Sequence, residues 1–167
     1  MTLFNRFSTK AKVITLVVAL PVLLGAWYAF RPEKLFINQQ VSEAAPAALQ
    51  GQPEALFTGK LEGKAHPTAG RATVYQSGGK QYLRLTDFST SNGPDVHVIL
   101  AAADDPALNQ QIVAGNLNYL ELGSLKGNQG DQNYDLPATA DLAKYQAVVI
   151  YCERFHAVFG VARLEKF

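Results

Sequence analysis

The sequence is poor in the residues that build disulfides and haem-attachment motifs. Its 167 residues include one cysteine, Cys152, so no disulfide can form within the chain. Neither Cys-x-x-Cys nor Cys-x-x-Cys-His occurs, which argues against a thioredoxin-type redox motif and against covalently attached haem. Nucleophile elbows, phosphate-binding loops and paired catalytic carboxylates are also missing. The sequence therefore favours a redox or binding module over a stand-alone enzyme.

Neither sign of charge is in excess. The 15 basic and 14 acidic residues give a net charge of +1. A basic excess would favour a nucleic-acid partner and an acidic run a disordered tail, so we expect neither. Hydrophobic residues make up 48% of the chain, and one dense block of them lies near the N-terminus.

That block, Val13–Phe30, has the composition of a transmembrane helix. It carries no charge and is about 18 residues long, which is near the minimum for a span. Pro21 lies near its middle, where membrane helices tolerate a kink. Trp27 and Tyr28 lie at its C-terminal end, where amphipathic rings settle among lipid headgroups. We therefore expect residues 13–30 to contact a lipid membrane.

The charges around the block predict its orientation. Three basic residues precede it, and two basic residues with one acid follow it: Arg6, Lys10, Lys12, then Arg31, Glu33 and Lys34. By the positive-inside rule, residues 1–12 are cytoplasmic and the C-terminal domain is periplasmic or extracellular. The alternatives are a cleaved signal peptide and a core helix of a soluble protein. A cut after Ala29 would put Trp27 where a small residue is required, so we favour an uncleaved anchor.

The rest of the chain divides into a linker, residues 31–55, and one all-β domain, residues 56–167. The linker contains three prolines and no sustained periodicity. In the domain, short apolar stretches recur at about ten-residue intervals between Gly, Pro, Asn and Asp. About eight strands without long helical periods between them predict an antiparallel β-sandwich.

Seven of these strands can be given bounds. They are Ala72–Gln76, Lys80–Phe88, Asp95–Ala102, Tyr119–Leu125, Gln132–Leu136, Tyr145–Phe155 and Ala157–Leu164. Ser77-Gly78-Gly79 predicts a hairpin between the first two. In the third, Val96, Val98 and Leu100 share one face and His97 lies on the other. Tyr145–Phe155 is the most apolar, so we expect it to be central.

Four stretches of the domain match a known family in sequence and in order. They are FTGKLEGKAHPTAG (57–70), LRLTDFSTSNGPDVHVIL (83–100), LELGSLKGNQGDQNYDLP (120–137) and DLAKYQAVVIYCERFHAVFGVARL (141–164). Together they resemble the DM-thirteen family, described as an electron-transfer domain. Residues 31–46 also resemble the segment that precedes the domain in small membrane-anchored bacterial members.

The resemblance implies an all-β domain outside the cytoplasm. In animal relatives such domains accompany modules with cytochrome-like redox roles. The family's proposed redox residue corresponds to Cys152, either as a bare thiol or as a ligand to a group such as haem.

Cys152 is therefore the candidate redox and cofactor-binding residue, although its sequence context allows other interpretations. It follows four apolar residues, so it can equally be a small hydrophobe in the core. A reactive thiol needs partial exposure and a lowered pKa. In a regular strand Arg154 would share its face and stabilise a thiolate. A metal or haem ligand is the third interpretation.

Three histidines are candidate neighbours of Cys152. We favour His66, because it lies in a predicted loop and matches the family pattern more firmly. His97 is expected to be an ordinary strand residue. His156 would lie about 13 Å from Cys152 along an unbroken strand, although a turn at Glu153-Arg154 would bring the two together. Their spacing is unlike that of usual zinc sites, so we predict no metal site from these four residues.

The Gly-rich stretch before Tyr134 has a structural interpretation. Asp131-x-Asn133-x-Asp135 begins like a calcium loop, but Leu136 stands where glycine is required. Leu142 stands where a glutamate is required, so an EF-hand is excluded. A looser calcium site is left open.

Three function hypotheses follow. The leading one is a membrane-tethered extracytoplasmic module in which Cys152, with His66 nearby, transfers electrons or exchanges thiols with a redox partner protein. The alternative is a non-catalytic β-sandwich that binds a ligand or protein and in which Cys152 is structural. The third is an assembly factor for a membrane complex.

Overall fold

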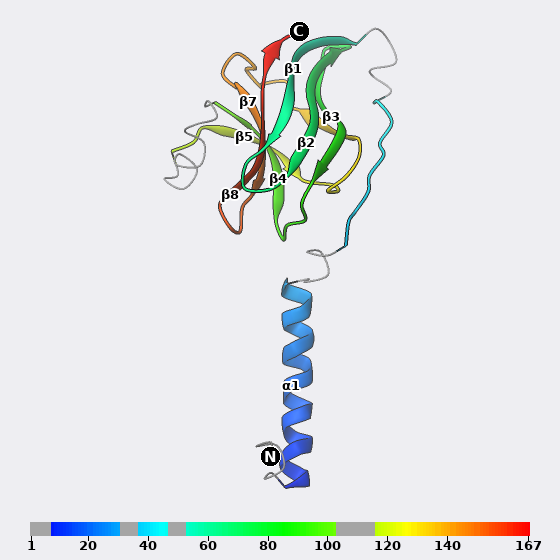
Figure 1. Cartoon of the computed structure of the whole chain (residues 1–167), viewed down its shortest axis with the longest axis vertical. Coiled ribbons are helices and arrows are strands. Elements are labelled where there is room, and N and C mark those ends of the chain that lie inside the picture. The colour runs from blue at the N-terminus through cyan, green and yellow to red at the C-terminus, as the bar shows by residue number, and fades with distance from the viewer. Residues whose placement is uncertain (1–7, 31–36, 47–52, 103–115) are drawn as a thin grey trace.

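The chain is described by a computed structural model over residues 8–30, 37–46, 53–102 and 116–167. An N-terminal helix, α1 (Thr9–Phe30), precedes a β domain (Figure 1). The helix begins four residues before the predicted span, because the Ser8 hydroxyl accepts a hydrogen bond from the Ala11 backbone N–H and caps it. Pro21 lies inside it. The length and apolar composition of α1 are sufficient to cross a membrane. Signal sequences share these two properties.

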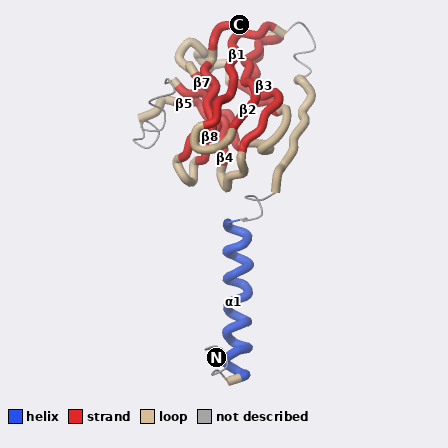
Figure 2. The backbone as a smooth tube through the Cα atoms, viewed as in Figure 1, coloured by secondary structure: helices blue, strands red, loops and turns tan. Residues whose placement is uncertain are grey.

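Over the residues that the structure describes, the β domain contains nine strands, and all of their pairings are antiparallel. Figure 2 shows the strands in red. They are β1 (Glu54–Gly63), β2 (Thr68–Ser77), β3 (Lys80–Thr90), β4 (Val96–Ala101), β5 (Tyr119–Ser124), β6 (Gln132–Leu136), β7 (Ala147–Cys152), β8 (Ala157–Arg163) and β9 (Glu165–Lys166). Their order is β5-β4-β7-β8-β1-β2-β3-β6, with β9 beside β1. The predicted antiparallel sandwich is confirmed.

Strand β1 joins the two halves of the sandwich. Its first part pairs with β2 and its last part, from Leu61 to Gly63, pairs with β8. The edge strands β5 and β6 approach each other, so the sandwich is nearly closed.

Sequence reasoning gave no bounds for β1, and it began β2 at Ala72, whereas β2 begins at Thr68. The β2–β3 hairpin is confirmed, since Gly78 and Gly79 have φ of 57° and 75°, as a type I′ turn requires.

Alternation along β4 and β7 divides the buried side chains into two clusters. Val98, Ile150 and Cys152 face the interior of the sandwich, together with Leu83 and Leu85 of β3. The opposite face of the same two strands carries a second buried cluster, which includes Ile99, Val149 and Tyr151. Every residue of β7 is buried, so the prediction that this strand is central is confirmed. Its predicted extent was too long, because a turn at residues 153–156 ends the strand at Cys152.

Residues 37–46, inside the range predicted as a linker, lie along the β domain. The backbone N–H of Gln39 donates to Asn128 Oδ1 at 2.7 Å, and that of Val41 donates to the Gln129 carbonyl at 2.9 Å. Gly127 permits this approach, because a Cβ there would collide with the Gln39 carbonyl and the Val41 side chain. We call residues 37–46 the docked segment.

Glu43 fixes the C-terminal part of the docked segment. Its carboxylate accepts hydrogen bonds from Lys126 Nζ at 2.8 and 3.0 Å and from the Asn133 backbone N–H at 2.7 Å. Partial burial alone would raise the pKa of Glu43, but these bonds and the charge of Lys126 together lower it. The ionised carboxylate is therefore the form that holds the segment.

Candidate functional site

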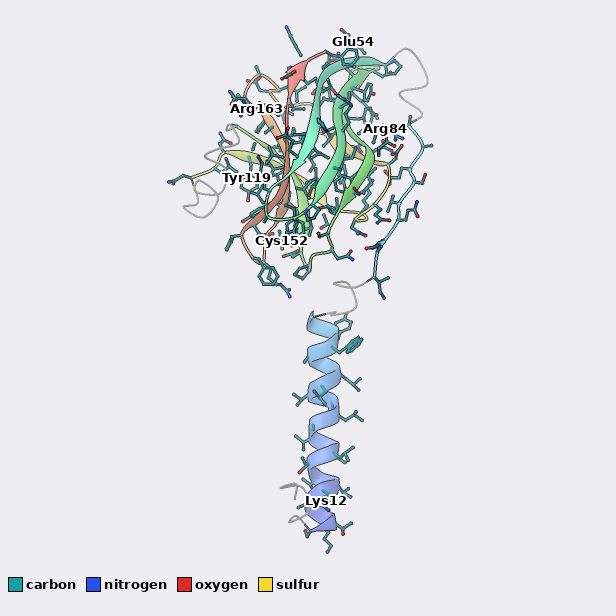
Figure 3. All side chains as sticks on the ribbon, in the orientation of Figure 1. Lys12, Glu54, Arg84, Tyr119, Cys152 and Arg163 are labelled. Carbon is teal, nitrogen blue, oxygen red and sulfur yellow. The ribbon has the colours of Figure 1, made fainter. Side chains whose placement is uncertain are left out.

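Cys152 is the last residue of β7 and is completely buried (Figure 3). Its backbone lies opposite Val96 of β4 and Ala157 of β8, and its side chain belongs to the interior cluster. Arg154 lies in the exposed turn beyond the strand. The predicted sharing of a strand face between Cys152 and Arg154 therefore does not exist. Because the exposed fraction of Cys152 is 0%, a solute reaches the sulfur only after local opening of the domain.

His66 lies in the loop between β1 and β2, packed against the start of β8. Its ring centroid is 3.9 Å from that of Phe159. The loop is fixed there because the backbone N–H groups of Lys64 and Ala65 donate to the carbonyls of Phe159 and Val158. Phe159 belongs to the same buried cluster as Cys152, so this ring connects the His66 loop to the core around the thiol. Among the described residues His66 and Cys152 share no hydrogen bond, and their pairing stays a prediction.

His156 lies in the turn between β7 and β8. The turn considered at Glu153-Arg154 is present, and it gives His156 a positive φ of 48°. His156 Nδ1 is 2.8 Å from the Tyr151 hydroxyl. Tyr151 faces away from Cys152 because neighbouring strand residues point to opposite sides. Burial raises the pKa of Tyr151 further above its ordinary value of 10.0, so its hydroxyl is protonated at neutral pH.

His97 lies at the centre of a group of carboxylates that sequence reasoning missed. Its Nε2 is 3.0 Å from Asp95 Oδ1 and 3.7 Å from Glu153 Oε2. Its Nδ1 is 2.6 Å from Glu121 Oε1 of β5. Only the Asp95-x-His97 spacing is visible in the sequence. The two glutamates arrive through the pairing of β4 with β5 and β7, which a single sequence does not reveal.

The electrostatics of His97 reflect these neighbours. Burial alone would lower its pKa, but hydrogen bonds with Asp95 and Glu121 and their negative charges outweigh burial and raise it. The His97 side chain is 14% exposed, whereas the three carboxylates are more open to solvent. The arrangement can hold a positive charge at Nε2, either a proton or a metal ion.

Two hollows on the β domain are lined by neither Cys152 nor His66. One lies between the docked segment and residues 91–96, and the other is lined by residues of β1, β2 and β8 such as Lys60, Arg71 and Arg163. A haem bound through Cys152 would have to displace the interior cluster, so the arrangement of these residues does not fit an open haem pocket.

Residues 60–164 match the model of a protein family described as Electron transfer DM13. The chain belongs to this family. The DM13 match runs from within β1 to just beyond β8, and it includes Cys152, His66, His97 and Glu153. The resemblance seen in the sequence is thus confirmed, and the family description supports an electron-transfer role. No curated protein and no solved structure matches the chain.

Proposed function

We propose that this DM13 protein is an electron-transfer module tethered to a membrane by α1, with its β domain outside the cytoplasm. The observation that carries the proposal is the electron-transfer family match, which spans the β domain almost from end to end. The apolar α1 helix, which is long enough to span a bilayer, supports the tether. The basic residues Arg6, Lys10 and Lys12 support a cytoplasmic N-terminus.

Cys152 is the proposed carrier, acting by thiol exchange with a redox partner. Its thiolate attacks one sulfur of a partner disulfide, so that a mixed disulfide forms and the other partner sulfur leaves as a thiolate. Because the chain has one cysteine, the reducing thiols come from a second partner, a reduced dithiol protein. One of its thiolates attacks the Cys152 sulfur and releases the first partner as a dithiol, and its other thiolate then attacks the new mixed disulfide, which regenerates the Cys152 thiolate and leaves the second partner oxidised. Access requires the exposed turn 153–156 and the end of β7 to open, a local event that costs less than global unfolding.

His66 is the proposed neighbour that influences this thiol. Its contact with Phe159 places it against the cluster that buries Cys152. If the loop moves with the opening of β8, His66 supplies an imidazole beside the exposed sulfur. The thiol pKa of the intact protein should then differ from that of His66→Ala, and equal values would exclude the pairing.

Thiol labelling tests whether Cys152 is reached from the native state. The full chain in detergent is labelled with an aromatic disulfide reagent over a series of urea concentrations below the unfolding transition. We expect a labelling rate that is nearly independent of urea, because local opening exposes little surface. Cys152→Ala supplies the background. A rate that follows the global unfolding rate at every urea concentration would exclude thiol exchange.

The complete burial of Cys152 favours a second candidate, a binding module with a structural cysteine. A hollow of about 150 Å³ between the docked segment and residues 91–96 offers a concave surface for a ligand. In this case Cys152→Ala retains the cellular function of the protein, whereas substitutions in the 91–96 loop abolish it. The redox proposal predicts the reverse.

A further inference from the structure

We propose that Asp95, His97 and Glu153 form a binding site for a first-row transition-metal dication, with Glu121 orienting the histidine. The proposal rests on the geometry of these four side chains and is independent of the role of Cys152. Three atoms, one from each of Asp95, His97 and Glu153, lie within 4.8 Å of one another.

The two separations from His97 Nε2 are close to those between neighbouring ligands of one metal ion. Nitrogen and oxygen ligands lie about 2.0–2.2 Å from Zn²⁺, so adjacent ligands are separated by about 2.8–3.6 Å in tetrahedral or octahedral geometry. The separation of His97 Nε2 from Asp95 Oδ1 is 3.0 Å, and that from Glu153 Oε2 is 3.7 Å. The Glu153 side chain is exposed and can close the remaining few tenths of an ångström by rotating.

Glu121 selects the ring nitrogen that is free to bind. An ionised carboxylate only accepts hydrogen bonds, so the 2.6 Å contact between Glu121 and Nδ1 places a proton on Nδ1. In the neutral ring Nε2 then carries the lone pair, and it faces Asp95 at 3.0 Å. Without a metal, a proton on Nε2 satisfies the contact with Asp95, and a bound dication displaces that proton and takes the lone pair. In carboxylate–histidine–metal arrangements the carboxylate fixes the tautomer and makes the ligand more basic.

Backbone pairing holds the ligands in place before an ion binds. His97 lies opposite Tyr151 in the β4–β7 pairing. The Glu153 backbone N–H donates to the Asp95 carbonyl at 2.9 Å, which fixes the turn that carries Glu153. The imidazole favours ions such as Zn²⁺, Cu²⁺ or Ni²⁺ over Mg²⁺ and Ca²⁺, which prefer all-oxygen ligands.

Zinc titration of the full chain in detergent tests the site. The chain is first stripped with a chelator, and binding is then measured by calorimetry at neutral pH. We expect one Zn²⁺ per chain, with a dissociation constant in the micromolar range or below, and no competition from millimolar Ca²⁺. His97→Ala should abolish binding, and Glu121→Gln should weaken it about 10–100-fold although it removes no ligand.

Two matched controls separate this site from other histidines. His66→Ala and His156→Ala each remove an imidazole that lies outside the cluster, so both should retain wild-type affinity. Glu153 lies in an exposed turn, so Glu153→Gln should keep the fold. Weaker Zn²⁺ binding by this variant then measures the contribution of the Glu153 carboxylate as a ligand. If Zn²⁺ does not bind, or binds His97→Ala as tightly as wild type, His97 is an imidazolium within an ion-pair network and the metal site is wrong.

Discussion

At the scale of single residues, the three histidines occupy three chemically distinct environments. His66 packs on the Phe159 ring, His156 contacts the Tyr151 hydroxyl, and His97 lies among carboxylates. Residue type alone therefore says little about role. The role of each histidine depends on which side chains the neighbouring strands and turns bring to its ring.

Cys152→Ser tests how the burial of the thiol contributes to stability. A hydroxyl is more strongly polar than a thiol and would be placed in an apolar cluster without a prepared partner. We expect the free energy of unfolding to fall by about 1–3 kcal/mol, measured by urea denaturation. Cys152→Ala is the matched control, because it removes the sulfur without adding a polar group. A serine variant as stable as wild type would mean that the position is solvated.

At the scale of elements, the docked segment depends on a glycine. Gly127→Ala would place a methyl group against the Gln39 carbonyl and the Val41 side chain. We expect either a loss of about 1–3 kcal/mol in unfolding free energy or release of the segment. Limited proteolysis and hydrogen exchange of residues 37–46 distinguish the two results. Gly25→Ala is the control, because a Cβ there meets nothing within 4 Å. Unchanged stability and protection would contradict the close approach.

Glu43 makes the docking of this segment dependent on pH. Its pKa is lowered in the folded protein, so the stabilisation is fully present above the ordinary value of 4.5 and is lost as pH falls through the lowered folded value. We expect hydrogen-exchange protection of residues 39–44 to weaken between neutral pH and strongly acidic pH. Glu43→Gln should weaken the protection at neutral pH and remove its pH dependence. Asp141→Asn, which removes an exposed ion pair with Lys144, should leave both unchanged.

Periodicity and turn chemistry predicted much of this fold. The bounds of Gln132–Leu136 match β6, and the faces assigned to His97 and Val98 are confirmed, because alternation is a local property. These local patterns could not predict the docked segment, because its hydrogen bonds join residues at least 41 positions apart and produce no periodicity in the sequence. The carboxylates around His97 were missed for the same reason. Cys152 was identified as a candidate from its neighbours in the sequence and from the family resemblance. Its burial depends on the packing of both sheets, which the sequence does not show.

At the scale of the whole molecule, the proposed topology makes a direct prediction. An alkaline phosphatase fused after Phe167 should be active if the proposed orientation holds, because Arg6, Lys10 and Lys12 precede the apolar block 13–30 and favour a cytoplasmic N-terminus. The protein should also remain with membranes after alkaline carbonate washing. Activity of only a cytoplasm-dependent reporter at the same position would reverse the orientation. A mature N-terminus at or beyond Phe30 would replace the anchor with a cleaved signal.

If α1 is the membrane anchor proposed above, the docked segment also limits the distance between the domain and the bilayer. Asn38 is held to the domain through Asn128 and Asn92, so the free covalent path runs from Phe30 only to Ile37. Whatever the conformation of residues 31–36, that path is at most about 25 Å long. In the proposed anchored state, the domain stays within that distance of the bilayer and meets membrane-bound partners by lateral diffusion, at an effective concentration far above that of the same domain in solution. A partner in the bilayer would therefore need only weak intrinsic affinity, whereas a bulky soluble partner would find the membrane-facing side sterically closed.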